Sequence, residues 1–123
     1  MITHYPSLQP EDIKSLARIV GRDYCHNDRL HIDLYSYDSS PYIHPPEVVV
    51  LPGTISEMAQ IVALARRRNW PLTGRGAGTS LSGGAVPICG GVLMSLARLN
   101  RIVHIDPIEQ TVLVECGVVN LVL

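Results

Sequence analysis

The residues best suited to chemistry form one stretch, residues 71–84, with the sequence PLTGRGAGTSLSGG. It holds half of the chain's 10 glycines, several hydroxyl side chains and one cation, Arg75. Glycine leaves backbone N–H groups uncovered and permits positive φ, so successive N–H groups can curve around an anion. Arg75 adds a planar, charged hydrogen-bond donor. The pattern predicts a phosphate-binding loop, and the alternative interpretation is a flexible turn between two strands.

Two well-known phosphate loops do not match this stretch. In the mononucleotide P-loop a lysine follows the second glycine, but Gly84 stands at that position. The dinucleotide fingerprint needs a third glycine where this chain has Leu81, and it needs a helix directly afterwards. We therefore expect a different phosphate loop, in which Gly76 and Gly78 adopt positive φ and lie close to the ligand.

The first half of the chain supplies the elements that precede the loop. Apolar residues at helical spacing predict a helix over 10–20 that Gly21 stops. Residues 23–40 read as a short helix with irregular chain, and their tyrosines are interpreted as packing residues. A proline-rich linker over 41–47 then leads into a continuous apolar run over 48–51, which predicts a buried strand.

The second half supplies one helix and several strands. Thr54 and Glu57 have the spacing of a capping box and predict the start of a helix that ends near Trp70. The strands expected after that helix cover 72–73, 92–96, 100–106 and 111–115, the last two pairing as a hairpin. This order of elements predicts an α+β fold.

The order of elements and two motifs resemble a known family. The motifs are R-G-A-G-T-S-L-S-G-G at 75–84 and A-R-L-N-R-I at 97–102. Together they closely resemble the N-terminal part of the FAD-binding (PCMH-type) domain of the vanillyl-alcohol oxidase superfamily, and within it the group of the glycolate oxidase FAD subunit and the D-lactate dehydrogenases. The resemblance implies an N-terminal helical segment followed by the first part of a two-subdomain fold. It also implies that the loop holds the FAD pyrophosphate through Arg75, Gly76, Ala77, Gly78, Thr79, Ser80, Gly83 and Gly84.

The same resemblance carries further expectations about activity. It implies a flavin-dependent oxidoreductase acting on 2-hydroxy acids, with FAD held non-covalently because the loop contains no histidine. It implies an iron–sulfur electron-transfer subunit, or the remainder of the enzyme, as partner. The resemblance also implies that four further residues lie near the cofactor: Met94, Ser95, Arg98 and Gly117. No residue of this chain is expected to be catalytic, and no metal ligands are expected, because no histidine pair has the spacing of a helical metal site.

The expected domain organisation follows from the same reading. Residues 1–40 form the helical segment, 41–47 the linker and 48–123 an FAD-binding domain truncated at its C-terminal side. Because the family's substrate domain would come later, we expect this chain alone to be inactive. The alternatives are a non-catalytic domain that binds a nucleotide or a partner, or an inactive fragment of the flavoenzyme.

Composition limits the remaining classes of function. With 10 basic and 11 acidic residues the net charge is −1, which provides no electrostatic footprint for nucleic acid. The 3 cysteines lack C-x-x-C spacing, which argues against a disulfide framework or a zinc site. No apolar run is long enough to span a bilayer, and the N-terminus has no secretory signal pattern. We expect a cytoplasmic protein, with membrane association through a partner as the alternative.

Overall fold

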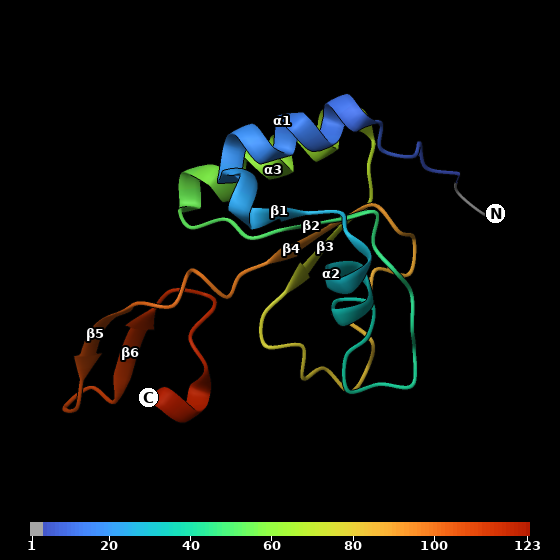
Figure 1. Cartoon of the computed structure of the whole chain (residues 1–123). Helices are drawn as coiled ribbons and strands as arrows, with labels where there is room; N and C mark the ends of the chain where they lie inside the picture. The colour runs from blue at the N-terminus through green and yellow to red at the C-terminus, as the bar shows by residue number, and fades with distance from the viewer. Residues whose placement is uncertain (1–3) are drawn as a thin grey trace.

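The computed structural model describes residues 4–123 as a four-stranded sheet with helices, followed by a separate two-stranded hairpin (Figure 1). The strands of the larger sheet lie in the order β1–β2–β4–β3. Their bounds are Cys25–His26 for β1, Val48–Val50 for β2, Leu72–Arg75 for β3 and Val92–Ser95 for β4. The strands β2 and β3 both pair in parallel with β4, whereas β1 pairs antiparallel with β2. This mixture of helices with parallel and antiparallel strands confirms the predicted α+β class.

Two helices pack together on one face of the sheet (Figure 1). They are α1, Pro10–Val20, and α3, Ile55–Arg68. Leu16 of α1 and Ile61 of α3 are completely buried, as is every residue of β2. Burial of such aliphatic side chains contributes about 1.5–3 kcal/mol each, so this helix–sheet interface is the main source of stability. The predicted helices and the buried strand are confirmed.

Local signals in the sequence explain where α3 begins and ends. The hydroxyl oxygen of Thr54 accepts a hydrogen bond from the Glu57 N–H at 3.1 Å. The Glu57 carboxylate accepts from the N–H of Gly53 at 2.7 Å, one residue before the partner that a strict capping box would use. At the other end Asn69 adopts the left-handed conformation with φ of 56° and stops the helix.

The segment before β2 contains more structure than its composition indicates. It forms a 3₁₀ turn over Arg22–Tyr24, the strand β1 and the helix α2, Arg29–Leu34. Strand β1 was not predicted, because two residues carry no periodic signal and are extended only through pairing with β2. The pairing places the N-terminal segment in the same sheet as β2 and β4. The domain boundaries expected around residues 41–47 stay a prediction.

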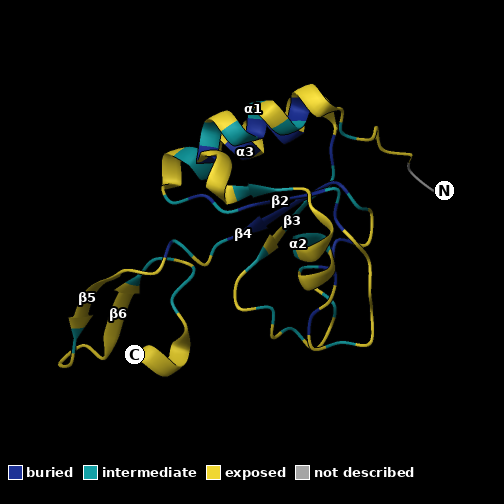
Figure 2. Cartoon of the chain, in the orientation of Figure 1, coloured by how far each residue is buried: buried dark blue, intermediate teal, exposed yellow. Residues whose placement is uncertain are grey.

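The hairpin consists of β5, Ile102–Asp106, and β6, Thr111–Val114, and it is confirmed. Most of its residues are exposed, in contrast to the sheet core (Figure 2). Arg101 and Glu115 close its open end, with guanidinium–carboxylate distances of 2.8 and 3.0 Å. After β6 the chain turns back toward the sheet and ends in a short 3₁₀ turn, Asn120–Val122.

Candidate cofactor-binding site

A cavity of about 220 Å³ lies where the glycine loop, residues 75–84, leaves the sheet. The parallel strands β3 and β4 end side by side at Arg75 and Ser95. Because ligands of open α/β sheets bind beyond the carboxyl ends of parallel strands, this edge is the expected place for a site. Three segments that follow strand ends form its walls, and the lining residues are Gly76, Ala77, Ala97, Asn100, Gly117, Val118, Val119 and Val122.

The glycine loop presents unused hydrogen-bond donors beside this cavity. The backbone N–H groups of residues 76–81 donate no hydrogen bond to any part of the described chain, residues 4–123. Gly76 and Ala77, at the start of this run, line the cavity. Backbone N–H groups without internal partners are the donors that an anion such as a pyrophosphate requires. The residues present therefore fit a phosphate-containing cofactor.

The far half of the loop is held by its own side chains and by the segment before β2. The Ser80 hydroxyl accepts hydrogen bonds from the N–H groups of Ser82 and Gly84, at 3.3 and 3.1 Å. The buried Asp38 carboxylate accepts from the Ala85 N–H at 3.3 Å. Its other oxygen accepts from the Ser40 N–H at 2.8 Å. Hydrogen bonding with the Ser40 side chain, followed by the backbone N–H groups of Ser40 and Ala85, keeps the pKa of Asp38 below its ordinary value. An ionised Asp38 thus ties residues 38–40 to the end of the loop.

Arg75 also joins these two segments instead of pointing into the cavity. Its guanidinium donates to the backbone carbonyl of Tyr37. It also lies over the ring of Tyr35, 5.3 Å from the centroid. The charge of Arg75 therefore supports the loop from the side of residues 35–37. The predicted packing role agrees with this contact for Tyr35, whereas Tyr37 is 47% exposed and only its backbone carbonyl takes part.

The two glycines expected to have positive φ behave differently. Gly78 has φ of +73°, and a Cβ added there would collide with the Arg75 guanidinium. Gly76 does not adopt positive φ, and a Cβ added there would meet nothing within 4 Å. The expectation is confirmed for Gly78 and wrong for Gly76. Gly76 lies in a bend directly after β3, and its missing side chain leaves space at the cavity wall.

The structure separates the predicted cofactor residues into two groups. Gly76 and Ala77 lie at the cavity wall. Six others do not line this cavity and belong to the loop that surrounds it: Arg75, Gly78, Thr79, Ser80, Gly83 and Gly84.

The four further residues expected near the cofactor also fall into two groups. Gly117 lines the cavity, and it must be glycine because a Cβ would lie 2.8 Å from the Leu99 carbonyl oxygen. Met94 and Ser95 are buried in β4, with 7% and 1% of their surfaces exposed. Arg98 turns to the other side, where it donates to the Leu51 carbonyl at 2.7 Å. A motif match does not show which way a side chain points. In the structure, the side chains of these three residues pack within or against the sheet.

Sequence reasoning missed several residues of the cavity wall. Ala97 and Asn100 belong to the A-R-L-N-R-I motif but received no individual role. Val118, Val119 and Val122 come from the end of the chain, and only the return of the chain after β6 brings them there. A run of valines carries no signal for a ligand wall. Only long-range packing identifies these residues.

Comparison with known families assigns the region that contains this cavity. Residues 46–123 match the family model described as FAD binding domain. The chain belongs to this family. The matched region of the FAD-binding domain includes the whole glycine loop and every residue of the cavity wall.

Relatives with curated names agree with this assignment. The chain is 38% identical over 103 residues to glycolate oxidase subunit GlcD of Escherichia coli strain K12, a match covering 84% of this chain and 21% of that protein. It is 33% identical over 115 residues to a D-lactate dehydrogenase of Anaerostipes hadrus, covering 93% of this chain and 24% of the relative. The chain therefore spans about a fifth to a quarter of the length of these relatives.

A solved structure gives the fold. The chain superposes on p-cresol methylhydroxylase with substrate bound with a TM-score of 0.77 and 24% identity, covering 86% of this chain and 22% of that one. This match confirms the predicted PCMH-type fold. Within residues 4–123, no helix has the length and apolar character needed to cross a membrane.

Proposed function

We propose that the glycine loop 75–84 holds the pyrophosphate of FAD, in a protein that oxidises small 2-hydroxy acids of the glycolate or D-lactate type. The observation that carries the proposal is the run of unpaired backbone N–H groups over 76–81 beside a cavity within the family's FAD-binding region. The names of the relatives supply the substrate class. FAD supplies the electron acceptor of the oxidation, and this chain supplies the donors that bind and orient it.

In this proposal the loop residues have distinct roles. The N–H groups of Gly76 and Ala77 contact the phosphate oxygens directly, and those of Gly78, Thr79 and Ser80 extend the same row of donors. Arg75, Gly83 and Gly84 position the row, through the contacts of Arg75 with Tyr37 and of Gly84 with the Ser80 hydroxyl. FAD is bound non-covalently, because the loop 75–84 contains no histidine to form a covalent link.

We further propose that catalysis requires protein beyond this chain. None of the residues that line the cavity, all of them within residues 4–123, carries a titratable side chain. A hydroxyl substrate needs a base to take its proton, and no side chain of this wall can act as one. The rest of the enzyme would provide that base, and an iron–sulfur partner subunit would accept the electrons that FAD takes up. We place the protein in the cytoplasm, and any attachment to a membrane would come through the iron–sulfur partner subunit.

The same observation supports the second candidate, a domain that binds FAD or another nucleotide without turnover. The test is a titration of the purified 123-residue chain with FAD, followed by flavin fluorescence and the visible spectrum, with AMP and inorganic pyrophosphate as competitors. Saturable binding near one FAD per chain, and release of the flavin by acid precipitation, are expected. A folded chain that does not bind FAD would overturn the assignment of the loop. Oxidation of glycolate or D-lactate by the chain alone, with an added electron acceptor, would refute the requirement for further protein.

A further inference from the structure

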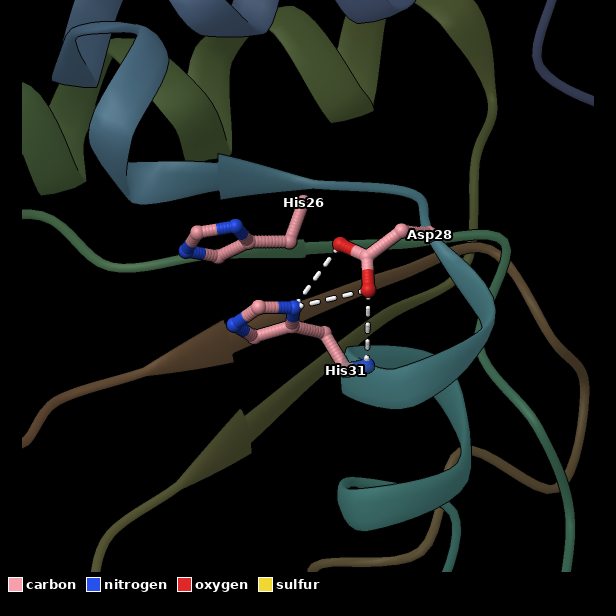
Figure 3. A group of neighbouring side chains, drawn as sticks. All are labelled: His26, Asp28 and His31. Atoms are coloured by element: carbon pink, nitrogen blue, oxygen red, sulfur yellow. Dashed lines mark hydrogen bonds and ion pairs between the residues drawn. The ribbon is translucent and has the colours of Figure 1, made fainter.

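Three polar side chains meet at the start of α2, away from the glycine loop (Figure 3). His26 comes from β1, Asp28 is the residue that caps α2, and His31 lies in the first turn of α2. The two imidazole rings stack with centroids 3.7 Å apart and an angle of 2° between their planes. Asp28 lies beside them, with its carboxylate directed at the His31 ring. The proposed FAD-binding function uses none of these residues.

Both carboxylate oxygens of Asp28 contact the His31 ring, and one of them also caps the helix. Oδ1 accepts the helix-capping hydrogen bond from the His31 backbone N–H at 3.2 Å. Oδ2 lies 2.7 Å from Nδ1 of the His31 ring, and Oδ1 lies 2.9 Å from the same atom. One oxygen is thus sufficient to cap the helix. The other takes no part in the cap, so it can exchange its contact with the His31 ring for a shared ligand without loss of the cap.

One potential ligand atom from each of the three residues lies within 4.8 Å of the other two. We propose that His26, Asp28 and His31 bind a divalent transition-metal ion, which replaces the proton shared by Asp28 and His31. Two imidazoles and one carboxylate form a ligand set suited to Zn²⁺ and its neighbours, whereas Ca²⁺ and Mg²⁺ prefer oxygen ligands alone. The remaining coordination positions face solvent and would hold water.

Binding requires the two imidazole rings to leave their parallel stack, because the nitrogen lone pairs lie in the ring planes and must both point at one ion. Metal–ligand distances of about 2.0–2.2 Å place the ligand atoms of a tetrahedral ion about 3.3–3.5 Å apart. The contact of 2.7 Å between Asp28 Oδ2 and His31 Nδ1 must open by about 0.6–0.8 Å, and a pair at the 4.8 Å limit must close by about 1.3–1.5 Å. The side chains of His31 and Asp28 are 33% and 53% exposed, so the Asp28 carboxylate has room to rotate, whereas the His31 ring must separate from His26. The bound ion would join β1 to α2.

The experiment is a calorimetric titration of the full 123-residue chain with ZnCl₂ in the absence of FAD. One saturable Zn²⁺ per chain is expected, with no saturable binding of Mg²⁺. His26→Ala and His31→Ala are each expected to weaken binding by more than the 10- to 100-fold that loss of an outer-shell partner typically costs. Asp28→Asn keeps a good helix cap but removes the charge, and it should also weaken binding. His104→Ala is the matched control, since His104 is exposed, lies two residues from an aspartate and is outside the cluster.

Each outcome of the titration either supports the metal site or overturns it. Loss of binding in the three cluster variants, with retention in His104→Ala, would support the site. Absence of saturable Zn²⁺ binding by the unmodified chain would overturn it. So would His26→Ala and His31→Ala variants that bind Zn²⁺ as tightly as the unmodified chain. Circular dichroism of each variant verifies that the fold is retained. Because FAD takes no part in the titration, a negative result here leaves the proposed FAD function unaffected.

Discussion

Replacing Gly76 by valine should weaken cofactor binding, whereas replacing Gly78 by valine should lower the stability of the fold. At Gly76 the backbone is compatible with any residue and a Cβ meets nothing within 4 Å. The new side chain instead enters the wall of the cavity, where Gly76 is one of the lining residues. Gly76→Val should therefore leave the free energy of unfolding within about 1 kcal/mol of the unmodified chain. Steric conflict of about 1–3 kcal/mol with the ligand would weaken FAD affinity about 5- to 150-fold.

At Gly78 the same substitution acts on the fold. A residue with a Cβ at φ of +73° costs about 1–2 kcal/mol, and a β-branched one costs at least that. The Cβ also displaces the Arg75 guanidinium, which then loses its hydrogen bond to the Tyr37 carbonyl. Hydrogen bonds to charged groups contribute about 1.5–3 kcal/mol, reduced here by solvent exposure. Gly78→Val should thus lower the free energy of unfolding by at least about 1 kcal/mol.

The assay measures both quantities for each variant, by urea denaturation and by FAD titration with flavin fluorescence. Gly74→Val is the control, because Gly74 lies in β3, has free space around its Cβ and does not line the cavity. It should change neither quantity appreciably. Unchanged FAD affinity in Gly76→Val would refute the placement of the cofactor in this cavity. Unchanged stability in Gly78→Val would refute the argument from positive φ and from the Arg75 contact.

Two further predictions concern titratable groups of the supporting structure. The lowered pKa of Asp38, caused first by its hydrogen bond with Ser40, means that the carboxylate contributes stability fully above its ordinary value of 3.8 and loses it as pH falls through the lower folded value. Hydrogen exchange of the Ala85 amide should show protection that disappears in this acid range, and Asp38→Asn should abolish the pH dependence. Burial raises the pKa of the Cys25 thiol from 9.0 to about 11, so at neutral pH its thiolate fraction should be about 100-fold lower than that of an ordinary cysteine. Iodoacetamide should accordingly label the exposed Cys89 long before Cys25, and equal labelling rates in the folded chain would contradict the burial.

The amino-acid sequence by itself determined the local elements and the class of cofactor. Helix α3 could be predicted because Thr54 and Glu57 begin it and Asn69 and Pro71 end it, all through contacts within a few residues. The glycine loop 75–84 could be found because its composition alone removes the side chains that would cover the backbone N–H groups. Such signals depend on neighbours in the chain, so they can be read without a structure.

The tertiary structure alone decided which residues meet. The cavity wall combines Gly76 with Asn100 and Val119, which contacts across the sheet edge bring together. Arg75 has the chemistry of a phosphate ligand, yet its contact with the Tyr37 carbonyl, 38 residues away in sequence, turns it to another role. His26 and His31 lack the spacing of a helical metal site, and they stack only because β1 pairs with β2 while Asp28 starts a helix beside it. Each arrangement depends on packing between distant segments, which residue types and spacing do not encode locally.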